Sequence, residues 1–328
     1  LHALGDPVVT GPMIAEASGR GEAALDALVQ PARVFARIEP TQKEQIVASF
    51  MRGGHFVAVT GDGVNDAPAM RRANVGVAMG KRGSDVARET ADLIITDDNF
   101  ASIVDGIEQG RVVYNNIRKV IALLIATGFS ALLLFFCTAL AGLPMPMTAI
   151  QLLWLNLVAN GLQDVALAFE PREGHELERR PRRSREPIFE RRIVEHVLVT
   201  GSVMGLLAFA TYWVLLDQRT PEAEARNLTL MLMILFGNIH ALSSRSETRS
   251  IFRIRFFANP FLVLAVPLAQ AVHIGATYTP GLSDVLSLQP VSLQNWLTLL
   301  GVALLLLVIE EGHKALLRRE ERRNRVSA

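Results

Sequence analysis

The chain has 328 residues, of which 50% are hydrophobic and 20% charged, and its mean hydropathy is +0.28. Its net charge of +1 argues against a nucleic-acid-binding domain, which would carry a strong basic excess. Its single cysteine, Cys137, excludes a disulfide framework and a multi-cysteine metal site. The combination of a high hydrophobic fraction with many charged residues predicts one polar and one apolar zone. Because the chain opens at Leu1 in a sequence typical of the middle of a domain, we expect a piece of a longer protein.

Residues 1–110 are predicted to form the polar zone, with a soluble α/β fold. Short β-rich runs alternate here with helical stretches, a pattern typical of a mostly parallel, Rossmann-like sheet covered on both faces. We expect strands at 34–38, 55–60, 74–79 and 91–96, and helices at 40–51 and 84–90, with Ser84 as an N-cap.

The turn after the strand at 55–60 concentrates polar groups in the sequence Thr60-Gly-Asp-Gly-Val-Asn-Asp-Ala-Pro68. Ligands of parallel sheets bind at the carboxyl ends of strands, and glycine lets the backbone approach them closely. Asp62 and Asp66 would repel each other unless a cation or a neighbouring base compensates. Mg²⁺ suits this pattern because it takes one or two carboxylates together with phosphate oxygens and water. The alternative is an Asx-rich turn that only links strand to helix.

Residues 111–328 are predicted to contain six membrane-spanning helices. Residues 120–143 carry no charge and are long enough to cross a bilayer, and the helix near 111–119 is expected to run directly into this span. The other candidate spans are Thr148–Phe169, Val194–Leu216, Leu228–Ser244, Pro260–Tyr278 and Leu293–Ile309, of which the fourth is short and polar. Six spans put both ends of this zone on the same side of the membrane.

Arginine and lysine are concentrated in alternate loops of this apolar zone. Basic residues cluster at 172–192, 245–255 and 314–325, whereas the loops at 142–147, 217–226 and 279–290 carry few. By the positive-inside rule, the basic loops and the α/β zone are therefore cytoplasmic. Orientation of the helices and contact with anionic lipid are enough to explain most of these clusters.

Polar side chains inside the spans are functional candidates, because they are costly in a membrane. Asn156, Asn160 and Asp164 follow one another at a spacing of four, so we expect them on one helical face, with local unwinding near Gly161. The alternative is hydrogen bonding between helices. We expect His240 and His273 to be packing residues, with a proton-linked role as the alternative. Glu310 and Glu311 are expected to be solvated or to snorkel at the cytoplasmic end of the last span.

The Thr60–Pro68 string resembles the hinge motif of P-type ATPases, which belong to the haloacid-dehalogenase-like superfamily. The resemblance covers nearly the whole chain, and the calcium and sodium/potassium pumps are the most similar subgroup. It continues through Val34-Phe-Ala-Arg-Ile-Glu-Pro-Thr-Gln-Lys43, Met79-Gly80, Asp97-Asp-Asn-Phe100, Gly110-Arg111, Gln151-Leu-Leu-Trp-Leu-Asn156 and Arg180-Pro-Arg182. The resemblance implies that residues 1–110 are the C-terminal part of a cytoplasmic phosphorylation domain. Residues 111–328 would then be the stalk and a six-helix transmembrane domain.

The resemblance also implies roles for single residues. Asp62 and Asp66 would hold the catalytic Mg²⁺, within a cofactor-contacting stretch formed by Thr60, Gly61, Asp62 and Gly63. Asn65 would hydrogen-bond the transferred phosphoryl group, and Lys43 would neutralise its charge. ATP would be the substrate. The chain contains no D-K-T-G-T string, which carries the family's phosphorylated aspartate, so we expect no ATP hydrolysis by the chain alone.

For the transported cation, the resemblance implies ligands at Asn156 and Asn160. The family commonly has Asp at the second position, so Asn160 removes a negative charge. We expect Asp164, one helical turn later, to supply the missing carboxylate. The expected site has fewer carboxylates than a two-calcium pump, because ligand positions of the first and fourth spans align with Gly128, Ala131 and Gly237. Ca²⁺ or another small cation is expected, and a Na⁺, K⁺ or Mg²⁺ pump, a pump-like protein without turnover, and a soluble-type phosphatase are alternatives. Expected partners are the upstream part of the same pump, the transported cation and the lipid bilayer, in a plasma or inner membrane, without nucleic acid.

Overall fold

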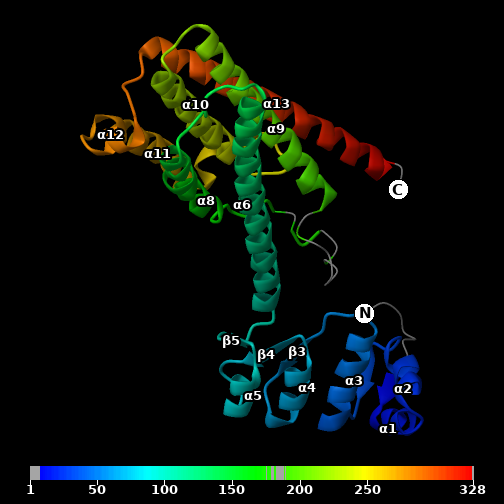
Figure 1. Ribbon diagram of the computed structural model, residues 1–328. Coiled ribbons are helices and arrows are strands. Elements are labelled where there is room, and N and C mark those ends of the chain that lie inside the picture. Colours follow the sequence, from blue (N-terminus) through cyan, green and yellow to red (C-terminus); the bar gives the residue numbers. More distant parts are fainter. Residues whose placement is uncertain (1–7, 175, 179–180, 182–187, 189, 327–328) are drawn as a thin grey trace. The chain divides into compact units, whose positions relative to one another are not determined.

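The computed structural model describes residues 8–174, 176–178, 181, 188 and 190–326. These fall into two compact units, with the boundary between Glu108 and Gln109 (Figure 1). Five arginines of the basic cluster predicted after the second span lie outside the described residues: Arg179, Arg180, Arg182, Arg183 and Arg185. The two units are considered separately below.

The first unit opens with a two-stranded parallel sheet. Strand β1 (Val8–Thr10) pairs with β2 (Val34–Ala36), and the helices α1 (Gly11–Gly19) and α2 (Glu22–Val29) lie between them in the chain. Apolar side chains of these elements, among them the fully buried Ile14, form a small core of their own. The strand at 34–38 is thus confirmed in shortened form, whereas β1 was not predicted.

The second sheet of this unit has three parallel strands in the order β3-β4-β5. They are β3 (Ala58–Gly61), β4 (Val75–Met79) and β5 (Leu93–Ile95), and the accompanying helices are α3 (Pro40–Arg52), α4 (Ala67–Arg72) and α5 (Asp85–Thr90). The predicted N-cap is confirmed, since the Ser84 hydroxyl accepts a hydrogen bond from the N–H of Ala87 at 3.2 Å. Parallel pairing follows the prediction, but the described strands form two small sheets instead of one.

The second unit is helical, and α6 (Ala101–Leu140) enters it as one helix of 40 residues. This helix contains both the segment 111–119 and the first predicted span. The remaining elements, labelled in part in Figure 1, are α7 (Ala149–Trp154), the π-helical η2 (Leu155–Asn160), α8 (Gly161–Leu167), α9 (Arg191–Asp217), α10 (Glu222–Ser243), the short turns η3 (Ile251–Arg253) and η4 (Phe256–Ala258), α11 (Pro260–Tyr278), α12 (Leu282–Leu286) and α13 (Leu293–Val326).

Five helices of the described chain are long and apolar enough to cross a membrane: α6, α9, α10, α11 and α13. They match the first, third, fourth, fifth and sixth predicted spans. The second predicted span is also helical, but it is divided into α7, η2 and α8, so no single helix covers it. This composition fits an integral membrane protein.

Helix α10 is the centre of the second unit. Within the structure, 83% of its most apolar window is buried, against 22% to 39% for the other four long helices. The outer helices expose large apolar side chains such as Leu132, Leu140 and Val308. Exposed apolar surface on the outer helices is expected where lipid, rather than water, surrounds a bundle.

A buried polar cluster joins the ends of several helices. The Glu170 carboxylate accepts hydrogen bonds from Arg245 Nε and Asn259 Nδ2, each at 2.9 Å, and its backbone oxygen accepts one from Asn116 Nδ2 at 2.6 Å. Glu170, Arg245 and Asn259 are at most 4% exposed. Because a charge this deeply buried is costly without partners, these bonds fasten the chain after α8 and after α10 to the start of α11.

Candidate functional site

The Thr60–Pro68 turn lies at the carboxyl end of β3, as the parallel pattern predicted. The strand ends at Gly61, and η1 (Val64–Asp66) leads from the turn into α4. A Cβ atom at Gly61 would lie 2.4 Å from the Cβ of Asp66 and 2.8 Å from the sulfur of Met70. Only glycine fits there, and its small size brings the end of the strand against Asp66.

Lys43 reaches the same turn from the first turn of α3. Its Nζ lies 2.5 Å from Oδ1 of Asp66, and the two side chains are 42% and 17% exposed. The start of α3 is held in place by Gln42, whose Oε1 accepts from the N–H of Glu39 at 3.0 Å and whose Nε2 donates to the Gly11 carbonyl at 3.0 Å. These bonds fix the helical turn from which Lys43 projects.

The charge on Asp66 is set by opposing effects. Partial burial acts to raise the pKa of this carboxyl, but the Lys43 ammonium and the nearby backbone N–H groups of Gly63 and Asp62 outweigh burial. The pKa of Asp66 therefore lies below its ordinary value, and the group is a carboxylate at neutral pH.

The other predicted residues of the turn lie open to solvent. Thr60, Asp62 and Asn65 are exposed and Gly63 is half-buried, while the Asp62 carbonyl accepts from the N–H of Ser84 at 2.8 Å. The structure thus brings Lys43 to Asp66 and places Asp62 and Asn65 on the same turn. Across the described residues no group of three or more His, Cys, Asp or Glu side chains could hold a metal ion. The donor set fits Mg²⁺ only together with oxygens from a phosphate or water.

Asp98 has a structural role that the sequence indicated only through the Asp97–Phe100 string. Its φ is +55°, and its carboxylate accepts from the backbone N–H groups of Lys81 and Arg82, each at 2.9 Å. These hydrogen bonds lower the pKa of Asp98. The end of β5 is therefore tied to the loop after β4, beside the Thr60–Pro68 turn.

The three polar residues predicted for a cation site lie in the divided second span. Asn156 and Asn160 belong to η2, and Asp164 belongs to α8. The expected local unwinding takes the form of a π-helical segment, a feature often found at functional sites. Asn156 is exposed and Asn160 is 4% exposed; Asp164 is half-buried, and its Oδ1 has no hydrogen-bond partner among the described residues. The three side chains therefore differ in burial, where one common face was expected.

Asn160 is directed towards Gly237 of α10. A Cβ atom at Gly237 would lie 2.8 Å from Asn160 Oδ1 and 3.7 Å from Gln163 Oε1, so two amide oxygens converge where this residue has no side chain. Gln163 Nε2 donates to Asn238 Oδ1, and Asn238 Nδ2 donates to Gln270 Oε1 at 3.1 Å. The buried Oε1 of Gln163 has no hydrogen-bond partner within the described part of the chain. Asn160, Gln163, Asn238 and Gln270 together form an amide cluster. Gln163 and Gln270 were not predicted as members, because only the packing of α8, α10 and α11 brings them close to Asn238.

The prediction of a solvated or snorkelling role was wrong for Glu310, which is buried. Glu310 Oε1 lies 2.6 Å from His240 Nδ1, both side chains being 1% exposed. Glu311 is mostly buried and accepts a hydrogen bond from the N–H of Ile251 at 2.9 Å. His273 packs in the interior as expected and accepts a hydrogen bond from Trp154 Nε1 at 3.3 Å.

Comparison with known proteins assigns the family. Residues 144–316, which include the divided span and the amide cluster, match the family model described as "Cation transporting ATPase, C-terminus". The chain belongs to the P-type cation-transporting ATPase family. The matched model describes the C-terminal part of these ATPases, which agrees with the resemblance carried by the Thr60–Pro68 string.

Several curated relatives align along most of this chain. It is 36% identical over 298 residues to the calcium-transporting ATPase of Bacillus subtilis (strain 168), covering 90% of the chain and 33% of that protein. It is 35% identical over 284 residues to the probable cation-transporting ATPase F of Mycobacterium tuberculosis (strain ATCC 25618 / H37Rv), covering 86% and 31%. It is 32% identical over 317 residues to calcium-transporting ATPase 1 of Yarrowia lipolytica, covering 97% and 34%. The chain thus spans about a third of the length of these relatives.

Proposed function

We propose that this chain is part of a pump that couples ATP hydrolysis, through an aspartyl-phosphate, to the movement of a cation across a membrane. The observation that carries the proposal is the contact between Lys43 and Asp66 at the carboxyl end of β3, within the Thr60–Pro68 motif. Family membership supports the reaction class. We propose a haloacid-dehalogenase-like phosphorylation domain that includes residues 1–110, and a stalk and membrane domain at 111–328.

The proposed chemistry depends on charge and positioning, as is general for phosphoryl transfer. Bound Mg²⁺ would neutralise phosphate charge, with Asp62 and Asp66 as its protein ligands. Lys43 would add a positive charge beside the phosphate and keep Asp66 ionised. Asn65, exposed on the same turn, would donate a hydrogen bond to a phosphoryl oxygen, and the backbone of Thr60–Gly63 would approach it closely.

Phosphoenzyme formation from radiolabelled ATP tests this proposal in the pump that contains the chain. Lys43→Met and Asp66→Asn should each slow phosphorylation by about 10²-fold, the size typical of losing one stabilising group in a transition state. Arg20→Gln is the control, because Arg20 forms an exposed ion pair with Glu16 away from the turn. A wild-type phosphorylation rate in Lys43→Met would refute the role assigned to this lysine.

We also propose that the transported cation binds in the divided second span, at Asn156, Asn160 and Asp164. This location is supported by the buried oxygens that converge on Gly237 and by Asp164 Oδ1, which has no hydrogen-bond partner among the residues that the structure describes. The names of two relatives, both calcium-transporting ATPases, make Ca²⁺ the first ion to test. Because charge count tunes ion affinity, a site with one carboxylate is better suited to one small cation than to two Ca²⁺.

Filling the space at Gly237 provides the test of this cation site. Gly237→Ala should displace the Asn160 amide, since the added Cβ would lie 2.8 Å from its Oδ1. Gly301→Ala is the matched control, because a Cβ there meets nothing within 4 Å. Ion-stimulated phosphorylation is measured across Ca²⁺, Na⁺, K⁺, Mg²⁺ and Mn²⁺. The proposal predicts a weaker ion dependence for Gly237→Ala alone, and unchanged dependence in both variants would exclude this location.

A pump-like membrane protein without turnover is the second candidate function. The observation that favours it is the composition of the amide cluster, in which Asn160, Gln163, Asn238 and Gln270 are all neutral. The same ion screen separates the two functions, since absence of phosphoenzyme with every ion would favour the second. For both we propose a plasma or inner membrane, with the basic loops and the α/β unit on the cytoplasmic side.

A further inference from the structure

A basic cavity lies at one end of the second unit, and none of its lining residues belongs to the amide cluster. Its volume is about 270 Å³, and the chain after α8 and the connection between α10 and α11 line it. Since a water occupies roughly 30 Å³ in the liquid, this volume accommodates a phosphate group together with adjoining ester oxygens and water. Five arginines line the cavity: Arg172, Arg245, Arg249, Arg253 and Arg255.

Both carboxylates of this cavity are already paired with cations. Glu170 binds Arg245 at 2.9 Å, and Glu173 binds Lys119 at 3.0 Å. By contrast, Arg253 and Arg255 are exposed, and among the described residues neither forms an ion pair with a carboxylate. The cavity therefore keeps an excess of positive charge in its wall, which favours an anionic ligand.

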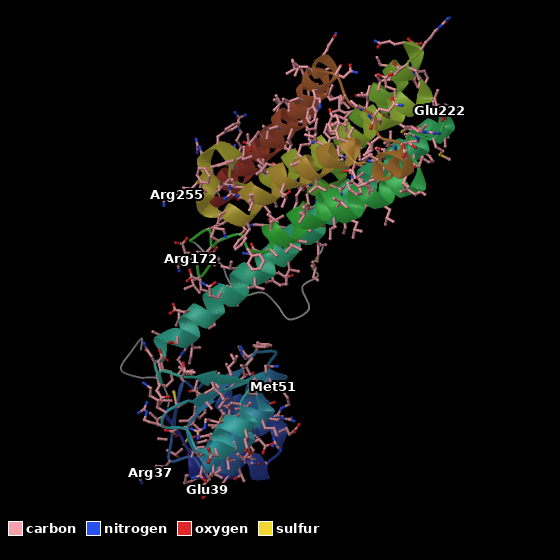
Figure 2. All side chains as sticks on the ribbon, turned by 90° about the vertical axis from the view of Figure 1, so that its left-hand side faces the viewer. Arg37, Glu39, Met51, Arg172, Glu222 and Arg255 are labelled. Carbon is pink, nitrogen blue, oxygen red and sulfur yellow. The ribbon has the colours of Figure 1, made fainter. Side chains whose placement is uncertain are left out.

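The surroundings of the cavity place it at the membrane surface. It lies where the apolar helices α10 and α11 are joined, and Arg172 and Arg255 are at the opposite end of the helices from Glu222 (Figure 2). The side chains of Phe252, Phe256 and Phe257, in the same connection as Arg255, are 80%, 53% and 76% exposed. Aromatic rings beside basic residues are typical of the level of lipid headgroups, where rings enter the acyl boundary and cations meet phosphates.

From this cavity, its charge and its position, we infer a binding site for the phosphate of an anionic phospholipid headgroup. Arg253 and Arg255 contact the phosphate, and the adjacent phenylalanines hold the lipid at the protein surface. Arg245 donates its hydrogen bonds to Glu170 and to the backbone carbonyls of Arg255 and Phe256, the latter two at 3.2 and 3.0 Å. It therefore positions the loop that contains Arg253 and Arg255 instead of contacting the phosphate. The site is independent of the proposed transport reaction.

The test uses the 328-residue chain in phosphatidylcholine nanodiscs that contain increasing fractions of phosphatidylglycerol. Native mass spectrometry counts the phosphatidylglycerol retained on the protein, which gives an apparent Kd. The combined variant Arg253→Gln/Arg255→Gln should weaken retention roughly 30-fold, or about fivefold for each arginine near a charged lipid surface. The control Arg219→Gln/Arg319→Gln removes equal charge from exposed positions that do not line the cavity.

Each outcome decides the inference. Loss of retained lipid in Arg253→Gln/Arg255→Gln, with the control unchanged, supports the site. Equal loss in both double variants shows a general charge effect and overturns it. A parallel sample receives inorganic phosphate at the same concentration. If phosphate displaces phosphatidylglycerol from the wild-type chain, the cavity is a soluble-anion site and the lipid assignment fails.

Discussion

Replacing Arg245 by methionine should be among the most destabilising single changes in the second unit. The Arg245 side chain is 1% exposed. Its guanidinium donates to Glu170 Oε1 at 2.9 Å and to the carbonyls of Phe256 and Arg255 at 3.0 and 3.2 Å. Removing one member of a buried ion pair typically costs about 3–5 kcal/mol, because the other charge stays buried. Asn259 still donates to Glu170 Oε2 at 2.9 Å in the variant, so we expect about 3 kcal/mol.

The free energy of unfolding is measured by SDS titration of the chain in mixed micelles. Arg191→Ala serves as the control, since Arg191 is 91% exposed and its ion pair with Glu195 should contribute less than about 1 kcal/mol. The double variant Arg245→Met/Glu170→Gln should recover part of the loss, because it no longer buries an unpaired charge. The reasoning is refuted if Arg245→Met costs no more than Arg191→Ala.

Three further predictions concern the turn and the buried pair. Asp66 has a lowered folded-state pKa, so its contribution to stability is present above the unfolded pKa of about 3.9 and is lost as pH falls through the folded value. Lys43→Met should therefore move acid unfolding of the first unit, followed by circular dichroism, to higher pH; an unchanged acid midpoint would contradict this. Gly61→Ala should cost about 1–3 kcal/mol in thermal unfolding, whereas Gly63→Ala, whose Cβ would meet nothing nearer than 3.9 Å, should cost less than half as much. Glu310→Ala should cost about 3 kcal/mol in the SDS assay, and a cost below 1 kcal/mol would show that its buried contact with His240 contributes little.

Local sequence signals were enough to find most of the elements. The period and length of apolar runs predicted four of the strands and five of the six spans as continuous helices, since these signals depend on neighbours within a few turns of chain. The position of the Thr60–Pro68 turn was also predicted from the order of elements along the chain. The turn follows a strand of a parallel sheet, so it lies at the carboxyl end of that strand.

Features that depend on residues far apart in the sequence were missed or wrongly predicted. Glu310 was expected in solvent because it lies near the end of an apolar run, but the packing of α13 against α10 buries it beside His240. The short strand β1 carried no alternation that marks it as a strand, and only its pairing with β2 reveals it. Gln163 and Gln270 are separated by 107 positions, and only through Asn238 do they join one amide network.

The sequence by itself determined the class of this protein, because a nine-residue turn and the length of its apolar runs carry that information locally. The tertiary structure decided which polar and charged groups meet. It brings Lys43 to Asp66, buries Glu310 with His240, and directs Asn160 towards the bare backbone of Gly237. The physical reason is that pattern and propensity act over a few residues, whereas burial and ion pairing depend on which helices and strands pack together.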